Sequence, residues 1–128
     1  MMKIRLLYLI PAPLAALVIF ISSNREIAEM PDLGFDAQDK LYHALGYFIF
    51  GVCLGMFFTG IRSDSPMRRT RLLTLLTGAI YAATDEIHQY FVPGRQCDIF
   101  DWVADLLGVA FALFILKFLQ GIYAKFNK

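Results

Sequence analysis

The chain has 128 residues, which is the length of a single domain. Its residues are 58% hydrophobic and 18% charged, whereas soluble domains average about 45–50% apolar and about 25% charged residues, so the composition favours a membrane protein. A formal net charge of +1 gives no indication of a nucleic-acid partner, and two cysteines are too few for a disulfide framework.

Four apolar segments follow one another along the chain, at about residues 6–21, 41–61, 72–91 and 99–119. A helix that crosses the hydrocarbon core of a bilayer needs about 20 residues. The second segment meets this length without any Asp, Glu, Lys or Arg, and the third and fourth meet it only if their acidic residues lie inside the span. We therefore predict an all-α, polytopic membrane protein, in which residues 1–128 form one bundle of four transmembrane helices.

The first segment follows Lys3 and Arg5, as the apolar region of a secretory signal peptide would. The run ends in Ser22-Ser23-Asn24-Arg25, which is not a convincing cleavage site. We therefore favour a retained signal-anchor helix, bent at Pro11 and Pro13, over a cleaved peptide.

The second segment carries a polar face at its beginning. Asp39, His43 and Tyr47 recur every four residues and so share one side of a helix. Asp39 has an alternative role as an N-cap, and Lys40 has one as a side chain that extends to the interface. His43 lies deeper, where it would act as a proton carrier or as a donor to an anion. The glycines of the same segment suit close helix packing in lipid; they are Gly46, Gly51, Gly55 and Gly60.

The third segment ends in Asp85-Glu86-Ile87-His88-Gln89, where Glu86 and Gln89 are spaced to face one pocket. The alternative is that the helix ends before these residues and leaves them in water. That would leave residues 72–84 to cross the core, which is too short unless the bilayer thins. His88 points away from the pair and is expected at the interface.

The fourth segment begins with Asp98, Asp101 and Asp105 on one stripe. Three carboxylates there repel one another unless a cation or protons lie among them. Asp98 also suits an N-cap. Arg95, in the preceding loop, would form an ion pair with Asp98 or Asp101, or would clamp a phosphate or carboxylate.

The basic residues predict the orientation in the membrane. With both termini and residues 62–71 in the cytoplasm, that side holds nine of the twelve basic residues and a single acid, Asp64. The polar residues of all three segments then lie in one outward-facing layer, where a shared cavity would keep them hydrated or paired. The nine basic residues are Lys3, Arg5, Arg62, Arg68, Arg69, Arg71, Lys117, Lys125 and Lys128.

Carboxylates near a histidine also suit a divalent cation such as Mg²⁺, Ca²⁺ or Mn²⁺, and we expect Glu86, Asp101 and Asp105 as its ligands. No serine lies near the polar residues of the second to fourth segments in the sequence, so a serine nucleophile is not expected. A cysteine nucleophile would require that Cys97 be activated.

The order and spacing of these residues resemble the VanZ-like family. The likeness covers residues 37–116, and position 105 is often Asn in that family, so Asp105 is a departure. The resemblance implies a small multi-pass protein of the bacterial cytoplasmic membrane, and the family's namesake is linked to resistance to the glycopeptide antibiotic teicoplanin. It rests on Asp39-Lys40-x-x-His43-x-x-x-Tyr47, Glu86-x-x-Gln89, Pro93-Gly94-Arg95 and Asp98-x-x-Asp101-x-x-x-Asp105-x-x-Gly108.

The first functional hypothesis is a cell-envelope protein that binds or modifies an amphipathic molecule, either a lipid-linked precursor or a lipoglycopeptide such as teicoplanin. Lys40 and Arg95 would contact its anionic head group, with Tyr47, Gln89, Asp98 and Asp105 beside them. The second is an enzyme acting on a lipid phosphate, with His43 as acid or base assisted by Glu86 and Asp101. The third is a cation- or proton-coupled transport unit formed as a homo-oligomer, and the fourth is a purely structural cluster.

Overall fold

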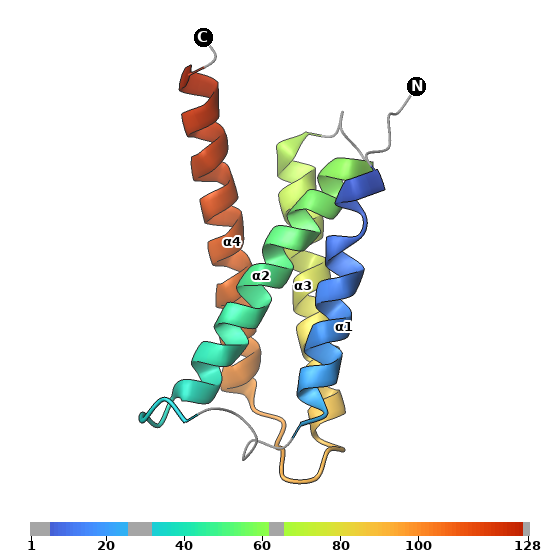
Figure 1. Cartoon of the computed structure of the whole chain (residues 1–128), viewed down its shortest axis with the longest axis vertical. Helices are drawn as coiled ribbons and strands as arrows, with labels where there is room; N and C mark the ends of the chain where they lie inside the picture. Colours follow the sequence, from blue (N-terminus) through green and yellow to red (C-terminus); the bar gives the residue numbers. More distant parts are fainter. Residues whose placement is uncertain (1–5, 26–31, 62–65, 127–128) are drawn as a thin grey trace.

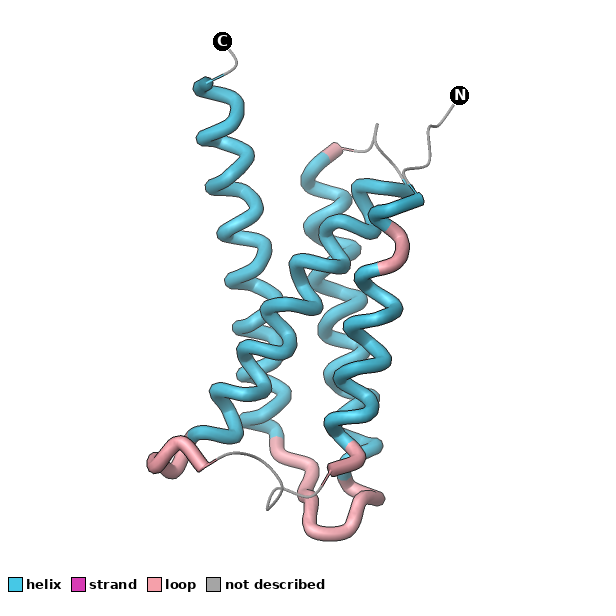
Figure 2. The backbone as a smooth tube through the Cα atoms, in the orientation of Figure 1, coloured by secondary structure: helices cyan, strands magenta, loops and turns pink. Residues whose placement is uncertain are grey.

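Helices account for most of the described chain. The computed structural model describes residues 6–25, 32–61 and 66–126, with side chains placed from Leu7 to Phe118 within these ranges. These residues form a short 3-10 helix η1 (Leu6–Tyr8) and four α-helices, α1 (Pro11–Ser23), α2 (Gln38–Ile61), α3 (Met67–Gln89) and α4 (Ile99–Phe126). Figure 2 shows that this described part contains no strand, which confirms the all-α prediction of four helices.

The helix ends follow local chemistry. The first helix starts at Pro11 and not at the expected position near Leu6. Proline suits the first turn of a helix, because the backbone N–H that it lacks would have no partner within the helix at that position. The prolines therefore begin α1 and do not bend it. At the other end of α3, Gln89 is still helical, so the acidic residues before it belong to the helix and not to a solvated tail.

The helix α2 lies at the centre of the bundle and packs against the other three, most extensively against α4. Figure 1 shows that η1 and the C-terminal end of α4 lie at the same end of the bundle. The opposite end carries the loops at residues 32–37 and 90–98. The loop before α2 and the loop before α4 therefore lie near the C-terminal end of α3, which brings the starts of α2 and α4 beside the end of α3.

Glycines permit the close packing of α2 against α4. A methyl group built on Gly51 would lie 2.9 Å from Cβ of Ala112, and one built on Gly108 would overlap the carbonyl oxygen of Ala44. Both contacts agree with the role that small residues have in membrane helix packing. Gly46 differs, since no neighbouring group of the described residues outside its own helix backbone lies within 4 Å of the position that its Cβ would take.

Two aromatic side chains link α1 and α4 to α3 through hydrogen bonds to backbone carbonyls. The Tyr81 hydroxyl donates to the carbonyl oxygen of Ala16 in α1 at 2.6 Å. The Trp102 indole N–H, in α4, donates to the carbonyl oxygen of Ala79 at 3.2 Å. Both rings are partly buried, so each combines apolar packing with a satisfied polar group.

The outer faces of all four helices are apolar, with exposed side chains such as Leu17 on α1, Ile49 on α2, Ile80 on α3 and Phe111 on α4. Within the described residues, two helices are long and apolar enough to cross a membrane, α2 and the part of α4 as far as Phe118. The 13 residues of α1 extend only about 20 Å at 1.5 Å per residue. The length and composition of these two helices agree with a membrane protein. Lys3, Arg5, Arg62, Asp64 and Lys128, used to predict its orientation, lie outside the described residues.

Candidate functional site

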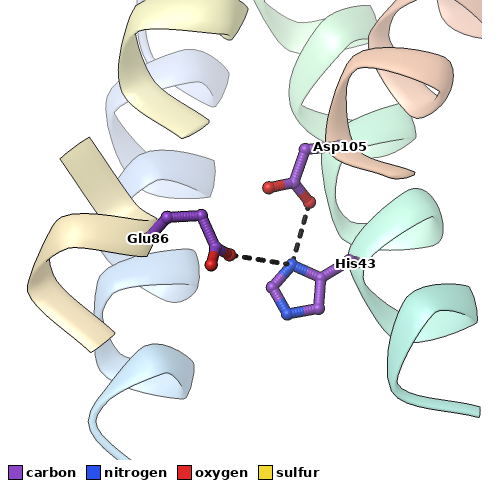
Figure 3. A group of neighbouring side chains, drawn as sticks. All are labelled: His43, Glu86 and Asp105. Carbon is purple, nitrogen blue, oxygen red and sulfur yellow. Dashed lines mark hydrogen bonds and ion pairs between the residues drawn. The ribbon is translucent and has the colours of Figure 1, made fainter. Parts of the chain in front are cut away.

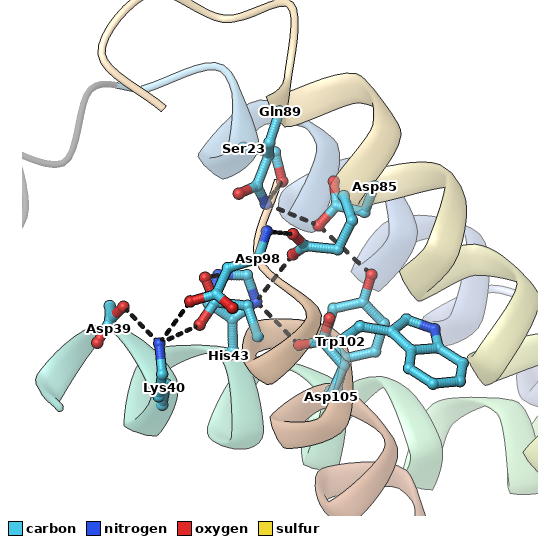
Figure 4. A network of polar contacts seen from close by, with 12 residues as sticks. Ser23, Asp39, Lys40, His43, Asp85, Gln89, Asp98, Trp102 and Asp105 are labelled. Carbon is cyan, nitrogen blue, oxygen red and sulfur yellow. Dashed lines mark hydrogen bonds and ion pairs between the residues drawn. The ribbon is translucent and has the colours of Figure 1, made fainter. Parts of the chain in front are cut away.

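Lys40 is the cation that meets the aspartates at the start of α4. Its Nζ lies 3.1 Å from Oδ2 of Asp39, 3.1 Å from Oδ2 of Asp98 and 2.9 Å from Oδ1 of Asp101 (Figure 4). The prediction that Arg95 pairs with Asp98 or Asp101 is wrong, because Lys40 projects from α2 directly onto α4. Lys40 is thereby engaged by three carboxylates, which removes it from the groups that would hold an anionic head group.

Asp98 also caps α4, as the sequence predicts. Its Oδ1 accepts a hydrogen bond of 2.8 Å from the backbone N–H of Phe100, in the first turn of the helix. The pKa of Asp98 lies below its usual value because this N–H, and then Lys40, stabilise the charged carboxylate. The cap fixes where α4 begins and so places Asp101 and Asp105 opposite α2.

His43 lies where α2, α3 and α4 meet, and carboxylates approach it from two helices (Figure 3). Its Nδ1 is 2.9 Å from Oδ1 of Asp105 and 3.8 Å from Oε1 of Glu86, and its Nε2 is 3.8 Å from Oδ2 of Asp101. His43 is nearly buried, with 9% of its side chain exposed. The predicted proximity of these residues from three helices is therefore observed.

Glu86 and Asp105 are both buried and only partly satisfied. Glu86 is 3% exposed and Asp105 is fully buried. The Glu86 Oε2 atom accepts a hydrogen bond from the backbone N–H of Asp98 at 2.9 Å. The other oxygen of Glu86, Oε1, and Oδ2 of Asp105 have no hydrogen-bond partner among the described residues.

A separate chain of hydrogen bonds runs through the C-terminal end of α3. The Tyr47 hydroxyl donates to Oδ2 of Asp85 at 3.4 Å, and the Gln89 amide donates to the same oxygen at 3.3 Å. Arg95 donates to Oε1 of Gln89 at 2.6 Å. Asp85 was not among the predicted site residues, although its spacing of four from Gln89 already placed the two on one helix face.

Ser23 lies against this chain of hydrogen bonds, and the expectation that serines are remote from the polar cluster is wrong. Its Oγ is 3.5 Å from the Gln89 amide nitrogen, because α1 packs alongside α3. The Ser23 hydroxyl donates to the carbonyl oxygen of Ile19 at 2.9 Å, so its proton is used within α1. This hydrogen bond gives Ser23 the role of a helix-end contact and does not activate it as a nucleophile.

A cavity of about 300 Å³ opens between α1, α2 and α3 at this end of the bundle. Val18 and Ile19 of α1 form an apolar wall, and two arginines, Arg25 and Arg95, line the cavity with them. The open space beside Gly46 is part of the cavity. The remaining lining residues are Ser22, Ser23, Tyr42, His43, Tyr47, Asp85 and Gln89.

Two residues near the cluster lie outside the cavity. His88 is half-buried, packs against Phe20 with ring centroids 4.9 Å apart and the rings tilted by 32°, and contacts the side-chain oxygen of Asn24 at 3.1 Å. Cys97 is exposed in the loop before α4. His88 thus contacts Phe20 and Asn24 at the end of α1, and its expected position at the membrane interface stays a prediction.

A sequence model of the family described as VanZ/LLP1 matches residues 6–120, which is nearly the whole chain. The chain belongs to the VanZ/LLP1 family. The match includes α1, which the residue motifs alone did not cover. This VanZ/LLP1 protein is therefore related to its family over all four helices, and the motif residues described above lie within the matched region.

The VanZ/LLP1 chain is also similar to a protein of the fission yeast Schizosaccharomyces pombe, named "Uncharacterized protein C11E3.10". The two are 29% identical over 102 residues, which cover 80% of this chain and 60% of the yeast protein. The chain thus corresponds to about 60% of that relative's length. A yeast relative means that this similarity does not by itself place the chain in a bacterium. No solved structure matches the chain.

Proposed function

We propose that this VanZ/LLP1 protein spans the membrane with four helices and carries its polar cluster on the outer side. The exposed apolar side chains of all four helices support this arrangement, because lipid would cover surfaces that water disfavours. The segment before α1, including η1, would supply the length that the 13 residues of α1 lack. The distribution of basic residues favours a cytoplasmic position for both chain ends.

The two cysteines allow this orientation to be tested directly. Cys97 is exposed in the loop at the outer end, whereas Cys53 is partly buried within α2. In intact cells that express Cys53→Ala, a membrane-impermeant maleimide should label Cys97. The matched variant Cys97→Ser should stay unlabelled. Labelling of Cys97 only after the membrane is permeabilised would show that the proposed orientation is reversed.

We further propose that the cavity binds an amphipathic molecule with an anionic head group, such as a lipid phosphate of the cell envelope. One observation carries this proposal: the cavity combines an apolar wall on α1 with two arginines, Arg25 and Arg95. Guanidinium groups suit phosphates because they donate parallel hydrogen bonds to two oxygens. Since Lys40 is engaged by aspartates, Arg95 would be the main contact of the two residues first expected to bind the head group.

The volume of the cavity restricts the ligand. Small-molecule sites range from about 300 to 1,000 Å³, and this cavity of about 300 Å³ lies at the lower limit. It suits a phosphate head group with the first part of a lipid chain. An intact lipoglycopeptide such as teicoplanin would enter only with its acyl chain. The size therefore favours a lipid-linked phosphate over the whole antibiotic.

A pair of lipids that differ only in the phosphate tests the proposal. The purified protein in nanodiscs is offered undecaprenyl phosphate or undecaprenol, and the retained lipid is measured by native mass spectrometry. We expect preferential retention of the phosphate lipid. Arg95→Ala should weaken it by about 10–100-fold, because a charged hydrogen bond contributes about 1.5–3 kcal/mol. The matched control is Arg68→Ala, which removes an exposed arginine near the other end of α3.

A second variant separates the cavity from the charge. Gly46→Leu would fill the open space beside α2 without a clash at Cβ, since no packing neighbour in the described part of the chain lies within 4 Å of that position. It should abolish retention of undecaprenyl phosphate while the protein stays folded. Equal retention of the phosphate lipid and the alcohol by the wild type, or full retention by Gly46→Leu, would contradict binding in this cavity.

A second candidate function is an enzyme that acts on the bound lipid phosphate. The observation in its favour is that His43 lines the cavity and also contacts Asp105 at 2.9 Å, as a general acid or base held by a carboxylate would. An enzyme should release phosphate from the lipid, and His43→Gln should lose this turnover while lipid retention persists. Retention without any turnover by the wild type would leave the binding function alone.

A further inference from the structure

Three buried donor groups next to the cavity have no part in the proposed lipid binding. They are the imidazole of His43 and the carboxylates of Glu86 and Asp105, and one donor atom from each lies within 4.8 Å of the others. They come from α2, α3 and α4, so residues far apart in the sequence converge at one point (Figure 3). Lipid binding as proposed needs only the arginines and the apolar wall.

The unsatisfied oxygens are the second observation at this point. Glu86 Oε1 and Asp105 Oδ2 are buried without a hydrogen-bond partner in the described structure. His43 Nδ1 lies within hydrogen-bond distance of Asp105 Oδ1, at 2.9 Å. Its distance to Glu86 Oε1 is 3.8 Å, which is too long for a hydrogen bond. A buried carboxylate oxygen left in this state is costly, and one imidazole cannot satisfy both carboxylates at once. A cation between the two carboxylates would satisfy both of them.

We infer that His43, Glu86 and Asp105 form a binding site for a divalent cation. This set differs from the one expected from the sequence, because His43 takes the place of Asp101. Asp101 is instead held by Lys40 at 2.9 Å and faces His43 Nε2 with its other oxygen at 3.8 Å. Metal-ligating histidines commonly have a carboxylate near the other ring nitrogen. At 3.8 Å Asp101 lies beyond hydrogen-bond distance of Nε2, so it acts on the ring through its charge alone.

The donor types select the cation. One imidazole nitrogen with two carboxylate oxygens suits Zn²⁺ or Mn²⁺, whereas Mg²⁺ and Ca²⁺ prefer oxygen donors alone. Three protein ligands also leave at least one coordination position open, which is typical of catalytic or substrate-binding zinc sites and not of structural ones. Because His43 lines the cavity, a ligand there would be close to the ion.

The ion content of the purified full-length protein tests the inference. Protein in nanodiscs is stripped with EDTA, dialysed against Zn²⁺, Mn²⁺ or Mg²⁺, and analysed by inductively coupled plasma mass spectrometry. We expect one equivalent of Zn²⁺ or Mn²⁺. Changes to residues that only support a metal-ligating side chain weaken metal binding by about 10–100-fold. Because Glu86 and Asp105 would bind the metal directly, Glu86→Gln and Asp105→Asn should each weaken metal binding by more than this. Asp39→Asn is the matched control, because it removes a carboxylate whose ion pair, among the described residues, is with Lys40.

A measurement on the wild type alone guards against variants that fail to fold. Electron spin echo modulation of bound Mn²⁺ should show coupling to one imidazole nitrogen, because His43 is a ligand. Two results would overturn the inference: folded wild type that takes up neither Zn²⁺ nor Mn²⁺ stoichiometrically, or bound Mn²⁺ without nitrogen coupling. Measuring lipid retention with EDTA present keeps this outcome separate from failure of the proposed lipid binding.

Discussion

Replacing Gly108 by alanine perturbs a close approach of α4 to the backbone of α2. A Cβ at this position would overlap the carbonyl oxygen of Ala44 and would lie 2.9 Å from the backbone nitrogen of Phe48. These neighbours are backbone atoms, so no side chain can rotate away, and α2 must move as a whole. Overpacking a close contact costs about 1–3 kcal/mol. We expect Gly108→Ala to lower the free energy of unfolding by about 3 kcal/mol, at the upper end of this range.

Gly46→Ala is the matched control for this prediction. It adds the same methyl group to α2, the partner helix, at a position that no packing neighbour in the described structure approaches within 4 Å. Its free energy of unfolding should equal that of the wild type or exceed it by up to about 1 kcal/mol, because alanine favours a helix over glycine. Denaturant titration in detergent micelles, followed by circular dichroism, measures both variants. Equal stability of the two variants would refute the described packing of α2 against α4.

Three further predictions concern the tertiary contacts. Lys40→Met should cost about 1–3 kcal/mol, less than a fully buried pair because the lysine is 34% exposed. Adding Asp101→Asn should recover part of this loss, and a double-mutant cycle that shows no coupling would contradict the ion pair. Tyr81→Phe should cost about 1 kcal/mol through the lost hydrogen bond to Ala16, measured by the same titration; unchanged stability would mean that α1 is not held there. EDTA should lower the thermal midpoint of metal-loaded wild type but not that of Glu86→Gln, because a bound ion stabilises only the folded state.

The residues that share one helix face were predictable from the sequence. His43 and Tyr47 are four apart on α2, and both reach the polar cluster as expected. The partner of Arg95 was not predictable. Its position in the loop before α4 suggested an aspartate, yet it donates to Gln89. Loop length limits how far a side chain can reach, but it does not set the direction in which the loop turns.

Ser23 shows the same limit for a whole helix. The sequence places it far from the residues of α2 to α4, and only the packing of α1 beside α3 brings it to Gln89. Contacts between neighbouring turns follow from the 3.6-residue period of a helix. Contacts between helices also depend on the rotation and crossing angle of each helix, which many side chains decide together.

The sequence by itself determined that the chain is helical and apolar, and that its polar residues gather at one end, because hydrophobic period and segment length follow from local composition. The tertiary structure alone decided which charges meet. Lys40 pairs with Asp98 and Asp101, whereas His43 lies between Glu86 and Asp105. The physical reason is the close approach of α2 and α4 at their glycines, because the distance between the two helices decides which side chains of one helix contact the other.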